Sequence, residues 1–192
     1  MGYFDDKKNV EEYIKMAEGF DGRELIQILK KYLKKGASVL ELGMGPGKDF
    51  EILREHYQVT GSDNSAAFVE RYRKKDRSAD VLLLNATTMG IERKFDGVYS
   101  NKVLHHLTKQ ELKESFKRQA EILNRDGILF HSLWYGDKEE EMSGLRFVYY
   151  TEETFGTIVG DEYEVVASER YTEMEPDDSI YFVLRKRVLR KR

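Results

Sequence analysis

The chain has 192 residues, of which 40% are hydrophobic and 35% charged, and its formal net charge is -3. This size and balance are typical of one soluble globular domain, and no apolar run approaches the roughly 18 residues of a membrane span. Cysteine is absent, which excludes disulfides, thiolate zinc sites and cysteine nucleophiles and favours a reducing, cytoplasmic location.

The charge is unevenly distributed along the chain. Six of the eight residues from 185 to 192 are basic, and the rest of the chain has 26 basic against 35 acidic residues. An acidic body argues against nucleic acid as a partner. We expect the basic tail, 188–192, to be a solvated end, with phosphate binding as the alternative.

Residues 1–35 are predicted to form a helical cap in front of an α/β core that covers 36–187, within a single domain of 1–192. Two helical patterns occupy 3–35, and Phe20-Asp21-Gly22 separates them. Lys34, Lys35 and Gly36 are typical of a helix end. The first helix carries Tyr13, which we expect to line the substrate side of a pocket.

A glycine-rich turn follows the first predicted strand, Ser38–Leu42, and precedes a helical pattern. Gly43, Gly45 and Gly47 allow positive φ and let a ligand approach the backbone closely. A strand that enters a helix through such a turn forms the nucleotide-binding corner of doubly wound sheets. The alternative is a tight turn that binds nothing.

Polar residues end the next two predicted strands, 58–62 and 81–84. Asp63 lies 20 residues after Gly43, near the distance at which an acid accepts hydrogen bonds from ribose hydroxyls. The alternative is that Asp63 only caps a helix near Ser65. Asn85 and Ala86 follow the third strand, where an Asx turn explains Asn85 equally well.

The second half of the chain continues the alternation of strands and helices. Strands are predicted at 95–101 and 128–133 around an amphipathic helix, and two further strands at 163–166 and 180–184 form a hairpin. Thr151 is the predicted N-cap of a short helix. The stretch from Tyr135 to Phe147 is predicted to be a polar loop that helps to enclose the site.

The glycine turn, with Glu41 two residues before Gly43, resembles motif I of the class I S-adenosylmethionine-dependent methyltransferases. The stretches FDGVYSNKVLHHL and ILNRDGILFHSL resemble the same family, and the matches together cover 38–133. The resemblance implies an α/β, doubly wound, Rossmann-like sheet of seven strands in the order 3-2-1-4-5-7-6, the last antiparallel, with an N-terminal helical cap.

The resemblance also implies S-adenosylmethionine as the cofactor and methyl transfer as the activity. The cofactor-binding residues that it implies are Glu41, Gly43, Gly45, Gly47, Asp63, Asn64, Asn85, Ala86 and Asn101. An NAD-type Rossmann oxidoreductase is one alternative, although Lys48 stands where its third glycine would fall. A non-catalytic relative that only binds the cofactor or a nucleotide is the other.

A small molecule is the expected methyl acceptor, because the fourth strand lacks the Pro-Pro-aromatic pattern of amino-methylating DNA enzymes. His105 is the predicted catalytic base or orienting group, because Leu104 and Leu107 would bracket His106 on the buried flank. His131 is the alternative base, and packing is the alternative for every histidine. The predicted substrate-binding residues are Tyr13, His106 and Trp134. The adjacent histidine pair alone predicts no metal site.

Overall fold

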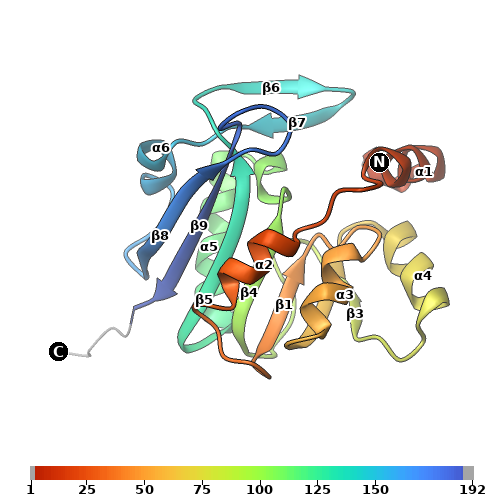
Figure 1. Ribbon diagram of the computed structural model, residues 1–192, viewed down its shortest axis with the longest axis horizontal. Coiled ribbons are helices and arrows are strands. Elements are labelled where there is room, and N and C mark those ends of the chain that lie inside the picture. Colours follow the sequence, from red (N-terminus) through yellow and green to blue (C-terminus); the bar gives the residue numbers. More distant parts are fainter. Residues whose placement is uncertain (1–2, 188–192) are drawn as a thin grey trace.

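The computed structural model describes residues 3–187 and contains a seven-stranded sheet with helices on both faces (Figure 1). The strand order is β3-β2-β1-β4-β5-β9-β8. The first five of these strands are parallel, β9 is antiparallel to β5, and β8 is antiparallel to β9. This confirms the predicted fold class. The strands predicted as the sixth and seventh are β8 and β9, because β6 and β7 form a separate sheet. The strands of this sheet are β1 (Ser38–Leu42), β2 (Gln58–Asp63), β3 (Val81–Leu83), β4 (Phe95–Asn101), β5 (Leu123–Trp134), β8 (Tyr163–Tyr171) and β9 (Ser179–Lys186).

Successive side chains of each strand point to opposite faces of the sheet, so the core has two layers. Val39 and Phe130 pack against α2 and α3 on one face, whereas Leu40 and Leu129 pack against α5 on the other. Figure 1 shows α2 and α3 in front of the sheet and α5 behind it. The helices are α1 (Lys7–Met16), α2 (Arg23–Leu29), α3 (Lys48–Arg54), α4 (Ala66–Lys75), α5 (Lys109–Ile122) and α6 (Glu152–Gly156), with the 3-10 turns η1 (Tyr3–Asp5) and η2 (Leu104–His106).

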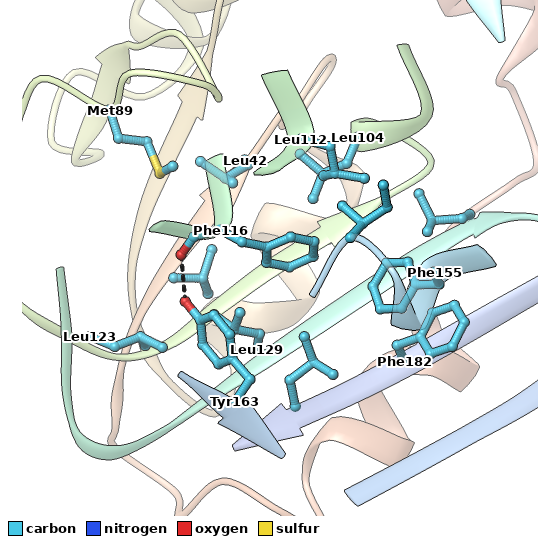
Figure 2. Close-up of a cluster of buried hydrophobic side chains, with 14 of the residues drawn as sticks. Leu42, Met89, Leu104, Leu112, Phe116, Leu123, Leu129, Phe155, Tyr163 and Phe182 are labelled. Atoms are coloured by element: carbon cyan, nitrogen blue, oxygen red, sulfur yellow. Dashed lines mark hydrogen bonds between the residues drawn. The ribbon is translucent and has the colours of Figure 1, made fainter. Parts of the chain in front are cut away.

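The face covered by α5 and α6 has an aromatic core (Figure 2). Phe155 of α6 stacks on Phe182 of β9 with ring centroids 3.8 Å apart, and the Tyr163 hydroxyl donates to the Phe116 carbonyl at 2.7 Å. Each fully buried side chain of this size stabilises the fold by roughly 1.5–3 kcal/mol. This core anchors the β8–β9 hairpin beside β5, and the predicted C-terminal hairpin is thereby confirmed.

The N-terminal cap is smaller than the predicted 1–35. Leu25, Ile26 and Leu29 of α2 are buried against the sheet, so this helix is a layer of the α/β core. Only η1 and α1 lie outside the core layers, close to α4 (Figure 1). The predicted break at Phe20-Asp21-Gly22 is confirmed, since α2 begins directly after it.

The stretch from Tyr135 to Phe147 is not a loop, and the prediction on this point was wrong. It contains most of a second sheet, in which β6 (Glu139–Met142) pairs antiparallel with β7 (Leu145–Val148). Ser143 and Gly144 join the strands with φ of 53° and 79°, the positive values that a two-residue hairpin turn needs. In Figure 1 the hairpin lies over the carboxyl ends of the central strands.

The remaining boundaries follow the predictions with shifts at strand ends. Thr151 is the N-cap of α6, as expected. β8 extends five residues beyond its predicted end and β9 two, and β5 begins five residues before its predicted start. The basic tail, 188–192, lies outside the described residues. Within 3–187, no helix is both long and apolar enough to cross a membrane.

Candidate active site

The three glycines of the β1–α3 turn have different surroundings. All three have positive φ, 69° at Gly43, 49° at Gly45 and 88° at Gly47. A Cβ at Gly43 would lie 2.4 Å from Val103 and one at Gly47 would lie 2.2 Å from a ring carbon of Tyr72. These two glycines are therefore needed for packing. A Cβ at Gly45 would meet only a ring carbon of Tyr13, at 3.7 Å, so Gly45 is the position where a ligand can approach the backbone.

Asp63 lies beside this turn at the carboxyl end of β2. One carboxylate oxygen accepts from the Gly45 amide at 2.9 Å, and the other accepts from the Ser65 amide at 2.8 Å. Ser65 itself caps α4 through its hydroxyl, so Asp63 is not the N-cap. Burial raises the pKa of Asp63, and the backbone hydrogen bonds oppose that shift. The neighbouring Asn64 is exposed.

Glu41 is the most deeply buried acid of the site. It is 3% exposed, and within residues 3–187 its Oε2 has no hydrogen-bond partner. Burial raises the pKa of Glu41 well above its ordinary value, and the charges of Asp49 and Asp63 add to the effect. Buried polar atoms in native proteins almost always have partners. An unpartnered carboxylate oxygen beside the glycine turn therefore fits a ligand that carries a hydrogen-bond donor.

Asp49, in the first turn of α3, is a residue that the sequence analysis missed. Its carboxylate accepts from the Gly22 amide at 2.6 Å, the Tyr99 hydroxyl at 2.8 Å and the Asn101 amide nitrogen at 3.1 Å. Asp49 thus ties the start of α2 to the end of β4. The Asn101 carboxamide oxygen accepts from Ser132, so both ends of this predicted cofactor residue have partners within the chain.

Asn85 and Ala86 lie one strand further out, after β3. The Asn85 side-chain oxygen accepts from the amides of Thr87 and Thr88 at 2.8 and 3.2 Å. This is the Asx turn that the sequence left open as an alternative. The Ala86 carbonyl accepts from Ser115 of α5. Contact of these residues with the cofactor stays a prediction.

Tyr13 reaches the glycine turn from the cap. Its ring packs edge-on against Phe4 and Phe68, which fixes α1 to α4. Burial raises the pKa of Tyr13, and the nearby acids Asp63, Asp49 and Glu173 raise it further. Tyr13 therefore lies over the β1–α3 turn, close to Gly45. It was predicted to line the substrate side, which stays a prediction.

The histidine pair lies under the β6–β7 hairpin. The His105 ring stacks on Phe147 at 5.2 Å and also approaches His106 and Trp134. His105 is 2% exposed, and neither ring nitrogen has a partner within residues 3–187. Burial lowers the pKa of His105 well below its ordinary value, and His106 and Lys102 lower it further. The imidazole is therefore neutral at pH 7.

The expectation that His106 would be the more buried residue of the pair was wrong. His106, not His105, is the more exposed residue, and its Nδ1 lies 2.7 Å from the Arg146 carbonyl of β7. The reason is the hairpin, which covers η2 and encloses His105 between Phe147 and Trp134. His105 nevertheless keeps two free nitrogens near the strand ends.

His131 belongs to the core rather than to the edge of the sheet. It is fully buried, with Nδ1 2.8 Å from the Ser100 hydroxyl and Nε2 2.9 Å from the Gln119 side-chain oxygen. Burial lowers its pKa to about 3. Because both nitrogens are engaged on the α5 face, we do not propose His131 as a base.

Lys102 is the second residue that the sequence analysis missed. It directly follows β4, and its Nζ lies 3.5 Å from the centre of the Trp134 ring. Burial lowers the pKa of Lys102 to about 7. The hydrophobic periodicity of a helix or a strand does not reveal a buried lysine. The residues that surround Lys102 come from β5 and β9, which are distant in sequence.

The predicted residues thus form two groups along the carboxyl ends of the strands. Glu41, Gly45, Asp63 and Tyr13 surround the β1–α3 turn, and Asp49 joins them. His105, His106 and Trp134 lie beyond β4 under the β6–β7 hairpin. In open α/β sheets this edge is where ligands bind.

Several known proteins are similar to this chain in sequence or in fold. A family model described as a methyltransferase domain matches residues 39–127. An uncharacterized methyltransferase of Oceanobacillus iheyensis is 28% identical over 138 residues, which are 69% of this chain and 62% of that protein. The match therefore spans less than two thirds of that relative's length.

Solved structures share the fold. The 1,6-didemethyltoxoflavin N1-methyltransferase of Burkholderia thailandensis, with its substrate and S-adenosylhomocysteine bound, has a TM-score of 0.76 and 19% identity, over 93% of this chain and 84% of that one. An S-adenosylmethionine-dependent methyltransferase of Clostridium acetobutylicum has a TM-score of 0.74 and 13% identity, over 94% and 99%. Residues 39–127 of the chain thus match a methyltransferase domain, and the chain has the fold of solved S-adenosylmethionine-dependent methyltransferases.

Proposed function

We propose that the protein transfers a methyl group from S-adenosylmethionine to a small molecule. The observation that carries this proposal is the hydrogen bond from the Gly45 amide to Asp63, which holds a carboxylate beside the open glycine of the turn. A carboxylate is an acceptor-only group, so it suits the two hydroxyls of a ribose.

The residues around the turn fit this cofactor. Gly45 would allow close approach to the backbone, and Asp63 would accept from the ribose. Glu41, whose buried Oε2 has no partner among the residues that the structure describes, would accept from the amino group of the methionine part. Asn85 and Ala86 would contact the adenine at the outer strand. When bound, the cofactor supplies an activated methyl group on its sulfonium.

The protein must also place the atom of the acceptor that receives the methyl group in line with it. Orientation of this kind can contribute about 7–11 kcal/mol in favourable systems. His105 is the proposed orienting residue, because its buried nitrogens have no partner in the described part of the chain and an acceptor could supply one. A neutral imidazole can both donate and accept a hydrogen bond. Trp134 and His106 would form the wall around it.

A small acceptor is supported by the segments that lie over the strand ends. α1 covers the glycine turn on one side, and the β6–β7 hairpin covers η2 on the other. The neighbour from Burkholderia thailandensis has a small heterocycle, 1,6-didemethyltoxoflavin, bound together with S-adenosylhomocysteine. The acidic body of the chain also disfavours a nucleic-acid acceptor.

The test is transfer of a labelled methyl group. The protein is incubated with methyl-labelled S-adenosylmethionine and a cell extract that has been separated into small molecules, protein and nucleic acid. We expect label in the small-molecule fraction alone. Label in protein or nucleic acid would contradict the proposed acceptor class. Cofactor binding without transfer to any fraction would favour the non-catalytic alternative.

We expect Gly45→Ala to weaken binding of S-adenosylhomocysteine by more than tenfold, about 1.4 kcal/mol, without preventing folding. The new methyl group has no clash within the protein and would project toward the ligand. Calorimetry measures the affinity, and thermal unfolding measures the strain of Ala at positive φ.

Gly36→Ala is the matched control for this change. Gly36 also has positive φ, 81°, and a Cβ there meets no atom within 4 Å. It lies before β1, at the other end of that strand from Gly45. Both variants should lose similar stability, and only Gly45→Ala should lose affinity. Equal affinities in the two variants would show that no ligand approaches Gly45.

A further inference from the structure

Lys102 lies in an unusual backbone conformation at the end of β4. Its φ is 54°, in the left-handed region that side chains other than glycine rarely adopt. Its amide donates to Ser132 of β5, to the carbonyl at 3.2 Å and to the hydroxyl at 3.1 Å. Strained residues of this kind gather at functional sites. This conformation directs the side chain toward the end of β5 and the start of β9.

The surroundings of the amine suit its charged form. The Nζ donates to the Leu133 carbonyl at 3.1 Å and to the Ser179 hydroxyl at 2.5 Å. The face of the Trp134 ring lies 3.5 Å away, in a cation–π contact. An ammonium has three hydrogens, and these three partners can receive all of them. A neutral amine would have to turn its lone pair toward an oxygen or the electron-rich ring face.

The charge is held without a carboxylate. Within residues 3–187, Lys102 forms no ion pair with an acidic side chain. Burial lowers its pKa to about 7, and the more distant acids of the β8–β9 loop oppose that shift. The titratable groups that face it from the surrounding elements are His105 from η2, His106 beside it, Tyr171 from β8, and Glu173 and Asp178 from the β8–β9 loop.

We propose that Lys102 is a positioning residue of the acceptor side: its ammonium fixes the Trp134 indole between the end of β4 and the start of β9. The proposal rests on the proposed function, because it assumes that Trp134 forms a wall of the acceptor site. All three ammonium hydrogens are used inside the protein, so Lys102 acts through Trp134 and does not contact the acceptor. Loss of the proton removes the cation–π contact and loosens the wall.

Trp134 is the single tryptophan of the chain, so all tryptophan fluorescence comes from the indole that Lys102 contacts. We expect the emission of the wild-type protein to change with pH in one transition with a midpoint near 7. Lys102→Met removes the titrating group, and its emission should stay constant from pH 5.5 to 8.5. Lys102→Arg keeps a permanent charge and should also show no transition, which covers the case in which the Met variant fails to fold.

His105→Gln is the control for a second titrating neighbour. The His105 ring lies 6.4 Å from the Trp134 ring, and burial lowers the pKa of His105 well below its ordinary value. The transition should therefore persist in His105→Gln. A transition that persists in Lys102→Met, or disappears in His105→Gln, would overturn the assignment to Lys102.

A second measurement separates this proposal from the proposed function. Lys102→Met should bind S-adenosylhomocysteine with wild-type affinity but transfer at least tenfold less label to the small-molecule fraction at pH 6. Equal transfer by the two proteins would overturn the positioning role. A wild-type protein that transfers no label to small molecules but shows the Lys102-dependent fluorescence would instead contradict the proposed function.

Discussion

Asp63→Ala is expected to weaken binding of S-adenosylhomocysteine by roughly 10- to 150-fold. The carboxylate is held beside Gly45 by the amide of that residue, and its burial makes it a poorly screened acceptor. Hydrogen bonds to a charged group are worth about 1.5–3 kcal/mol, and this range corresponds to the expected loss of affinity. Isothermal titration calorimetry of the folded variant measures it directly.

Asp63→Ala also removes the hydrogen bonds that the carboxylate accepts from the amides of Gly45 and Ser65. A control variant must therefore separate a loss of stability from a loss of affinity. Asp96 is suited to this, because it accepts from the amide and hydroxyl of Ser38 and from Asn124 at the opposite edge of the sheet. Asp96→Ala should lose stability and keep its affinity for the cofactor product. If Asp63→Ala folds and keeps wild-type affinity, the acid serves only to hold the loop before α4.

His105→Ala is expected to slow methyl transfer by roughly 10²-fold while cofactor affinity stays within a few-fold. The ring is enclosed by Phe147 and Trp134, and its nitrogens have no hydrogen-bond partner among residues 3–187. Loss of an orienting contact can misplace the acceptor, and a displacement of about 1 Å can cost 10²-fold in rate. The labelled-methyl assay measures turnover, and calorimetry measures cofactor binding.

His56→Ala is the matched control. His56 lies at the end of α3, at the amino edge of the sheet, where its ring approaches Lys30. This variant should transfer methyl groups at the wild-type rate. Wild-type turnover in His105→Ala, together with an unchanged unfolding temperature, would remove His105 from the acceptor site.

The elements around the β1–α3 turn could be predicted because their signals are local. β1 and β4 have the predicted bounds, since short apolar runs between turn residues specify strands directly. The proximity of Asp63 to Gly45 follows from parallel pairing of β1 with β2, which brings their carboxyl ends together. The spacing of Asp63 from Gly43 and the predicted strand order were therefore sufficient to predict that these two segments lie side by side.

The acceptor side could not be predicted in the same way. Lys102 is surrounded by β5 and β9, which are distant in sequence, so neither its burial nor its contact with Trp134 leaves a local pattern. The relative burial of His105 and His106 depends on Phe147 of a hairpin that was expected to be a loop. Only the Ser143-Gly144 turn was a local signal for that hairpin.

Calorimetric titration with S-adenosylhomocysteine and with NAD tests most directly whether the β1–α3 turn and Asp63 form a methyltransferase cofactor site. We expect S-adenosylhomocysteine to bind at one site per chain, at least tenfold more tightly than NAD, and Asp63→Ala to abolish most of that difference. Tighter binding of NAD than of S-adenosylhomocysteine by the wild-type protein would contradict the account.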